Sequence, residues 1–192
     1  MSTSYDILII GAGLNGASMA LGAAQFGLRV ALFDSNKIID QLDCEFDGRS
    51  YALSLTSVRM MQALGLWDTL TEHAQPMLDI KVCEGQLPDG PSPFFLHFDH
   101  NEIEEGPMGH MVQDRYIRPT LQAAVDQNDA IDYVADVRIA SHICTSEFAQ
   151  VTTNTGAEYR GQLLIAADGR QSATATREHI RRKGWEYGQT AL

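Results

Sequence analysis

The sequence has few basic residues and few cysteines. Its 192 residues include 14 lysines and arginines against 25 acidic residues, which gives a formal net charge of −11. An acidic chain repels a phosphate backbone, so we predict no nucleic-acid partner. Cys44, Cys83 and Cys144 are far apart and form no CxxC or Cys/His metal spacing. We therefore expect a reduced, cytosolic setting and no metal site.

Long polar tracts are also absent, and the one long uncharged stretch is interrupted by glycine. An apolar share of 44% excludes a disordered chain, and the length suits about one domain. Residues 7–28 carry no charge, as a membrane span would, but Gly11, Gly13 and Gly16 follow a β-rich run at once. The glycines within this run favour a buried strand, a glycine turn and a buried helix. Residues 1–5 contain no basic cluster, so we expect no secretory signal.

The first third of the chain has a strand–helix–strand pattern. Tyr5–Ile10 is a short apolar run of strand type, and Leu14–Phe26 has the composition of a helix that ends at Gly27. Arg29–Phe33 is a second strand, and it ends at Asp34. Such a unit within about thirty residues predicts a right-handed βαβ crossover and a parallel sheet.

The rest of the chain predicts both helices and strands. Pro76–Gly109 holds five of the six prolines and alternating apolar pieces, which indicates antiparallel strands outside the main sheet. Helices are expected at Leu53–Leu64, Trp67–His73 and Arg115–Gln127. Further strands are expected at Ile131–Val134, Val137–Thr145, Phe148–Thr153, and Glu158–Arg160 joined to Leu163–Ala167.

The glycine turn matches the GxGxxG pattern of dinucleotide-binding folds. Its six residues are Gly11, Ala12, Gly13, Leu14, Asn15 and Gly16. Gly11 permits the tight exit from the strand, Gly13 lets a pyrophosphate approach the backbone, and Gly16 lets the helix pack closely. The helix N-terminus then offers N–H groups and a positive dipole end to the phosphates.

An acidic residue stands where such folds bind a ribose. Asp34 lies 18 residues past Gly16, and its carboxylate can accept both hydroxyls of an adenosine ribose. This favours FAD or NAD over NADP. A plain βαβ turn with a surface Asp34 is the alternative.

Four segments carry a resemblance to a known family. They are GAGLNGASMALGAAQFGLRVALFD from Gly11, DGRSYALS from Asp47, LLIAADGRQSATATR from Leu163, and GWEYGQTAL from Gly184. Together they resemble the flavoprotein aromatic hydroxylases typified by p-hydroxybenzoate hydroxylase, and within that family the ubiquinone-biosynthesis branch. Asp34 replaces the more usual glutamate of this family.

The resemblance implies FAD as cofactor and a set of residues that bind it. This set comprises the six residues of the glycine turn, Asp34, Ser35, Arg49 near the flavin phosphates, Val137 against the adenine, and Asp168 and Gly169 of the DG motif. Each further motif also has a plainer explanation. Arg49 can pair with Asp47 on the surface, Asp168 and Gly169 can form only a turn, and Val137 can be core.

The fold implied is α/β: a Rossmann-like FAD-binding domain with a parallel sheet and a β-meander, plus part of an antiparallel substrate-domain sheet. The FAD-binding domain is expected at residues 1–75 and 113–177, with substrate-domain strands at 76–112. Residues 178–192 are expected to be a truncated strand entering the substrate domain. Because the family's chains are about twice as long, we expect an N-terminal fragment. An exposed final strand would favour self-association.

The activity implied is that of an FAD-dependent monooxygenase, which hydroxylates the aromatic ring of a polyprenylated phenol in ubiquinone biosynthesis. NAD(P)H is the implied electron donor, and the protein's part is to orient the cofactor and exclude water. We expect the fragment to be inactive alone and assign it no catalytic residue. The prenylated substrate implies a cytoplasmic enzyme at the inner-membrane surface or in a biosynthetic complex.

Two alternatives stay open. One is another FAD-dependent oxidoreductase on the same scaffold, such as a prenyl reductase or halogenase. The other is a nonenzymatic dinucleotide-binding module.

Overall fold

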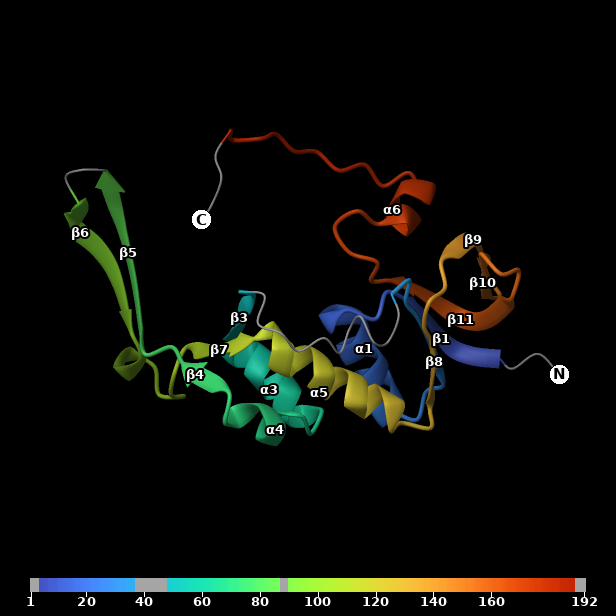
Figure 1. Cartoon of the computed structure of the whole chain (residues 1–192), viewed down its shortest axis with the longest axis horizontal. Helices are drawn as coiled ribbons and strands as arrows, with labels where there is room; N and C mark the ends of the chain where they lie inside the picture. Colours follow the sequence, from blue (N-terminus) through green and yellow to red (C-terminus); the bar gives the residue numbers. More distant parts are fainter. Residues whose placement is uncertain (1–3, 37–47, 87–89, 189–192) are drawn as a thin grey trace. The chain divides into compact units, whose positions relative to one another are not determined.

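The computed structural model describes residues 4–36, 48–86 and 90–188, and the chain divides into two compact units (Figure 1). Residues 1–36 and 130–192 make the first unit, and residues 37–129 make the second. These boundaries differ from the expected domain limits at 75/76 and 112/113. The assignment of those ranges to FAD-binding and substrate domains stays a prediction.

The first unit is built around a six-stranded sheet. Its elements are β1 (Ser4–Ile10), α1 (Leu14–Gln25), β2 (Val30–Phe33), β8 (Ile131–Val134), β9 (Ile139–Cys144), β10 (Ala149–Thr153), β11 (Glu158–Ala166) and α6 (Ala173–Arg177). The strand order is β8-β2-β1-β11-β10-β9. β1 pairs parallel with β2 and β11, and β2 pairs parallel with β8. β9, β10 and β11 form an antiparallel meander, so the predicted fold class is confirmed.

The centre of this sheet is apolar because its middle strands are buried. Leu8 and Ile9 of β1 are fully buried, as are Val30 and Leu32 of β2. Continuous apolar runs of this kind are typical of parallel strands covered on both faces. The uncharged stretch at 7–28 therefore contains most of β1, the glycine turn and the whole of α1. Among the described residues, no helix has the length and apolar character needed to cross a membrane.

The second unit combines helices with two small antiparallel sheets. Its elements are β3 (Ser50–Ser54), α3 (Leu55–Ala63), α4 (Trp67–Thr71), β4 (Ala74–Pro76), β5 (Asp79–Gln86), β6 (Gly90–Asp99), the 3₁₀ helix η1 (His100–Glu102), β7 (Gly109–Gln113) and α5 (Asp114–Asp126). One sheet has the order β3-β7-β4, and β5 and β6 pair as a separate hairpin. The antiparallel strands predicted in this part of the chain are thus confirmed.

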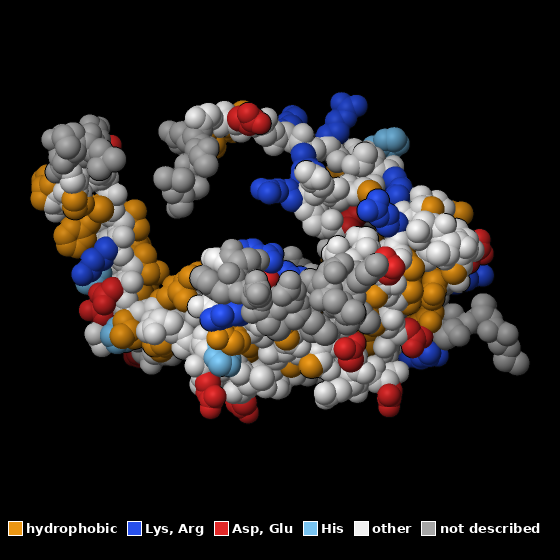
Figure 2. Space-filling view, in the orientation of Figure 1, with side chains coloured by type: hydrophobic (Ala, Val, Ile, Leu, Met, Phe, Trp, Pro, Cys, Tyr) orange, Lys and Arg blue, Asp and Glu red, His pale blue; other side chains and the backbone are white. Residues whose placement is uncertain are grey.

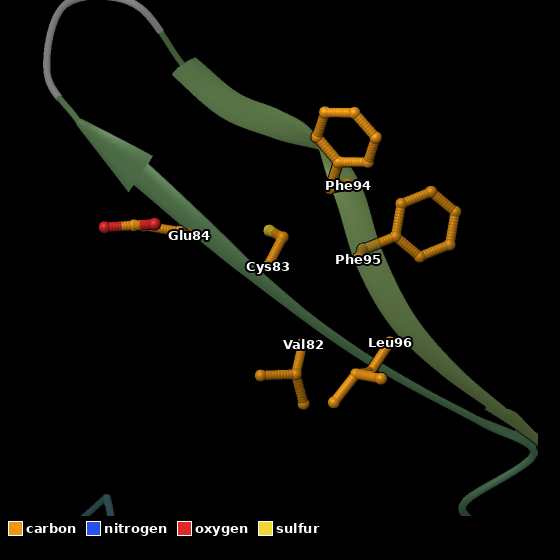
Figure 3. A pocket seen from close by; sticks show the side chains of 6 residues that line it. All are labelled: Val82, Cys83, Glu84, Phe94, Phe95 and Leu96. Atoms are coloured by element: carbon orange, nitrogen blue, oxygen red, sulfur yellow. The ribbon is translucent and has the colours of Figure 1, made fainter.

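The β5–β6 hairpin carries an exposed apolar face. Val82 lies opposite Leu96, and Ile80 lies opposite Phe98. Residues directly opposite in an antiparallel pair share a face, and Figure 3 shows Val82 and Leu96 on the same side of the ribbon. All four side chains are at least 38% exposed. Apolar side chains line the hairpin in Figure 2, and Figure 3 shows the six residues that line a pocket there: Val82, Cys83, Glu84, Phe94, Phe95 and Leu96.

Three elements differ from the prediction. β3 includes Leu53 and Ser54, which were expected to begin a helix; these residues form a strand because β3 pairs with β7 along its whole length. α6 was not predicted, because five residues are too few to show an apolar period. Residues 178–188 contain no strand, so the predicted final strand is wrong over this range. A strand needs a neighbour for its N–H and C=O groups, and the described residues provide none there. Residues 189–192 lie outside the described part.

Truncation of a central side chain tests this description of the core. Leu8→Ala should lower the free energy of unfolding by about 2–5 kcal/mol, because it opens a cavity at a fully buried position. Leu163→Ala on the neighbouring strand is the control: this side chain is 52% exposed, so its loss should cost less than about 1 kcal/mol. Urea denaturation of both variants measures the difference. Equal losses would contradict the assignment of Leu8 to the core.

Candidate cofactor site

The glycine turn leaves no room for side chains at two of its three glycines. Gly11 has φ +98°, and a Cβ there would lie 2.4 Å from the carbonyl oxygen of Ala167. A Cβ on Gly16 would lie 1.8 Å from the carbonyl oxygen of Gly11. Because neither residue has a Cβ, α1 can lie close to the end of β1, and the turn can lie against the end of β11. Gly11 and Gly16 therefore have the packing roles that the motif predicts.

Gly13 stands in open space at the start of α1. A Cβ at this position would meet nothing within 4 Å among the described residues. Gly13 is the N-cap of α1, makes no side-chain capping bond, and has no acidic residue in the helical turn after it. Leu14 and Asn15 follow, half-buried and exposed respectively. The first-turn N–H groups are thus available to an anion, and the open space suits a phosphate.

Asp34 binds the glycine turn through its carboxylate. Its Oδ2 accepts a hydrogen bond from the N–H of Ala12 at 2.7 Å, and its Oδ1 accepts one from the N–H of Asn36 at 2.8 Å. The residue is only 8% exposed, so the predicted alternative of a surface aspartate is wrong. Each carboxylate oxygen has a second lone pair for a ribose hydroxyl. Ser35 follows and is exposed.

Val137 lies beside Asp34, to which it is joined by a backbone hydrogen bond. Its N–H donates to the carbonyl oxygen of Asp34 at 3.0 Å, and its half-buried side chain packs against the core. The structure thus brings Val137 to the same end of β2 as the acidic residue. Its contact with an adenine stays a prediction.

Asp168 follows β11 and has one oxygen without a partner. Its Oδ2 accepts hydrogen bonds from the N–H and the hydroxyl of Thr174, at 3.1 and 2.9 Å. Its Oδ1 is buried and has no hydrogen-bond partner among the described residues. Burial raises the pKa of Asp168, but hydrogen bonds from Ser172 and Thr174 outweigh it and hold the pKa below its usual value.

Gly169 has φ +81°, so the DG pair does form a turn. That plainer explanation does not account for the unpartnered buried oxygen of Asp168, because buried acceptors in folded proteins nearly always have a donor. The sequence analysis missed the roles of Ser172 and Thr174. The available signal was a serine and a threonine four and six residues after the aspartate, in the pattern of a helix cap.

Arg49 belongs to the second unit and pairs with Asp114 there. Its Nη2 lies 3.2 Å from Asp114 Oδ2, and Arg118 binds the same carboxylate through Nε and Nη2, each at 3.2 Å. Asp114 is buried, whereas the Arg49 side chain is 56% exposed. Asp47, the partner that the sequence suggested, lies outside the described residues, and a phosphate role for Arg49 stays a prediction.

The groups of the first unit fit an FAD molecule. The turn, Asp34 and Asp168 follow the carboxyl ends of β1, β2 and β11, three neighbouring parallel strands. They offer N–H donors for phosphates, carboxylate acceptors for ribose hydroxyls, and one further buried acceptor. Ligands of open α/β sheets bind at this edge.

A model of one protein family, described as an FAD binding domain, matches residues 4–190. The chain belongs to this family. FAD, the cofactor predicted from the sequence, is therefore confirmed at the level of the family.

This FAD-binding domain is similar to two ubiquinone hydroxylases. It is 34% identical to ubiquinone hydroxylase UbiL of Rhodospirillum rubrum over 187 residues, which cover 97% of the chain and 42% of UbiL. It is 31% identical to ubiquinone hydroxylase UbiM of Neisseria meningitidis, covering 99% of the chain and 41% of UbiM. The predicted resemblance to the ubiquinone branch is confirmed. The chain spans less than half the length of these curated relatives.

The FAD-binding domain also shares its fold with a solved structure. PqsL of Pseudomonas aeruginosa, a probable FAD-dependent monooxygenase, superposes with a TM-score of 0.70 at 19% identity. The match covers 95% of this chain and 47% of PqsL. At this identity the likeness supports the fold alone.

The glycines give a matched pair of variants. Gly16→Ala should lower the free energy of unfolding by about 2 kcal/mol or more, because the backbone must move to admit the Cβ. Gly13→Ala should change it by less than about 1 kcal/mol, because its Cβ enters open space. Thermal or urea denaturation distinguishes the two. An equally large loss for Gly13→Ala would show that this position is packed rather than open.

The lowered pKa of Asp168 predicts a pH-dependent contribution to stability. A carboxyl with a depressed folded-state pKa stabilises the fold above its unfolded-state pKa of about 3.9, and this is lost as pH falls through the folded-state value. The stability difference between wild type and Asp168→Asn should therefore shrink between pH 6 and pH 3. Urea titrations at both pH values measure it. A difference that grows on acidification would contradict the assigned direction.

Proposed function

We propose that this chain is the FAD-binding part of an FAD-dependent monooxygenase that hydroxylates the ring of a polyprenylated phenol in ubiquinone biosynthesis. The observation that carries the proposal is its similarity to two ubiquinone hydroxylases across nearly the whole chain. The site geometry supports the cofactor, because three groups suited to FAD stand at one edge of the sheet. The substrate class rests on the relatives.

Different residues of the first unit would bind different parts of the cofactor. The N-terminus of α1 at Gly13 would hold the pyrophosphate, and Asp34 would accept hydroxyls of the adenosine ribose. Oδ1 of Asp168 would accept a hydroxyl from the flavin half. FAD bound here would supply the redox chemistry, with NAD(P)H as electron donor and oxygen as co-substrate.

The hairpin supports the assignment of residues 76–112 to a substrate domain. A two-stranded hairpin is marginal in water, and this one exposes Ile80, Val82, Leu96 and Phe98 on one face. Such a face is suited to pack against further apolar structure or a prenyl chain. Association of the whole enzyme with a membrane surface or a biosynthetic complex, and self-association, are part of the same proposal.

Flavin binding tests the cofactor site directly. The purified chain should quench FAD fluorescence with a stoichiometry of one and keep a yellow flavin spectrum after desalting. Gly13→Val should weaken this binding at least tenfold, because the branched side chain fills the space proposed for the phosphate. Gly22→Val is the control, since a side chain at this glycine also meets no neighbour and its φ is not positive, but it lies in the second half of α1, away from the glycine turn.

Two results would contradict the proposal. If Gly13→Val and wild type bind FAD equally, the flavin is held elsewhere. If wild type binds no FAD at millimolar concentration while its circular dichroism shows a folded chain, the described site is not a flavin site by itself.

A further inference from the structure

The orientation of the Asp168 carboxylate depends on a very short helix. Both donors to its Oδ2 belong to Thr174 of α6, and Ser172 is the N-cap of that helix, where its hydroxyl accepts from the N–H of Ala175 at 2.9 Å. α6 has five residues, and an isolated helix of this length is not stable in water. Something outside the helix must therefore hold it in place.

Two side chains from the end of α6 bind β9. Arg177 donates through Nη2 to the carbonyl oxygen of Ile139 at 2.7 Å. Oε1 of Glu178, the C-cap residue, lies 2.6 Å from Nε2 of His142. Only 2% of the His142 side chain is exposed, against 58% for Glu178. The helix is thus attached to the meander that lies at the edge of the main sheet (Figure 1).

The surroundings of His142 indicate which partner donates. Its Nδ1 is buried and has no partner among the described residues. The Glu178 carboxylate has only acceptor oxygens, so the hydrogen of this bond is carried by Nε2 of His142, and Nε2–H donates to the carboxylate.

We propose that His142 and Glu178 are positioning residues: by attaching α6 to β9 they hold the Asp168 carboxylate in the orientation in which Oδ2 accepts from Thr174 and Oδ1, unpartnered among the described residues, is left for a ligand hydroxyl. Neither residue needs to touch the cofactor. The part of this inference that concerns the cofactor rests on the proposed function, whereas the attachment itself can be measured without any ligand.

Glu178→Ala is the variant that removes the attachment with least risk to the fold, because more than half of this side chain is exposed. Without it, α6 should open more often. Exchange of the Thr174 amide hydrogen with solvent should accelerate about tenfold, the factor that corresponds to one lost hydrogen bond of a charged group. Glu147→Ala is the control, since Glu147 is an exposed glutamate in the turn between β9 and β10.

The pKa of Asp168, measured by carbon NMR of its carboxyl group, separates positioning from simple charge effects. Removing the negative charge of Glu178 would by itself lower this pKa or leave it unchanged. Loss of the hydrogen bonds from Thr174 would raise it toward the ordinary value. We expect a rise in Glu178→Ala, none in Glu147→Ala, and recovery in Glu178→Gln, whose amide oxygen still accepts from Nε2–H.

An unchanged or lower pKa of Asp168 in Glu178→Ala, or unchanged exchange at Thr174, would overturn the proposal whether or not the chain binds FAD. The link to the cofactor is tested by a separate measurement of FAD affinity. FAD affinity should fall several-fold in Glu178→Ala, and equal affinity in the two proteins would overturn the link to the cofactor. A wild-type chain that binds no FAD would instead refute the proposed function, while the NMR result still decides the attachment.

Discussion

The close contact between the glycine turn and the end of β11 is the constraint on which the rest of the site depends. Gly11 and Gly16 leave no space for a Cβ, so the start of α1, the end of β1 and the backbone at Ala167 lie in direct contact. This contact places the helix N-terminus beside the residue that follows Ala167, which is Asp168. A single methyl group at either glycine would separate the N–H groups proposed to bind a phosphate from the acidic residue proposed to bind the other half of the cofactor.

Parallel pairing then brings the remaining groups to the same edge. β1, β2 and β11 run in one direction, so the residues that follow them, at the turn, Asp34 and Asp168, are neighbours in space although they are far apart in the sequence. Asp34 strengthens this arrangement, because its carboxylate accepts from the N–H of Ala12 in the turn. Asp34, which is expected to bind a ribose, thus also helps to hold the glycine turn in place.

The sequence was sufficient for those parts of the fold that are determined by local pattern. The uncharged run at 7–28, with its glycines, correctly predicted a strand, a turn and a helix, and the DG motif was correctly placed at the end of a strand. Elements that depend on partners distant in the chain were not predictable in the same way. β3 is a strand only because β7 lies beside it, and residues 178–188 have no strand to pair with in the part of the chain that the structure describes.

The partners of charged groups were equally hidden from the sequence. Arg49 was assigned either to a phosphate or to nearby Asp47, and among the described residues it pairs with Asp114, 65 residues away and shared with Arg118. Nothing local marks such a pair, because it forms only when β3 and β7 align and place Arg49 next to the start of α5. The same holds for His142 and Glu178, which are 36 residues apart.

The fold by itself does not determine the chemistry. The groups at the sheet edge are chemically suited to phosphates and hydroxyls, which are parts that FAD presents to every enzyme using this cofactor. The reacting ring and the substrate need a binding pocket of their own. The β5–β6 hairpin, which belongs to the second unit, has an exposed apolar surface suited to line such a pocket. The choice of an aromatic hydroxylase over another flavin-dependent enzyme therefore rests on similarity along the whole chain, to proteins more than twice as long, rather than on the geometry of the cofactor site.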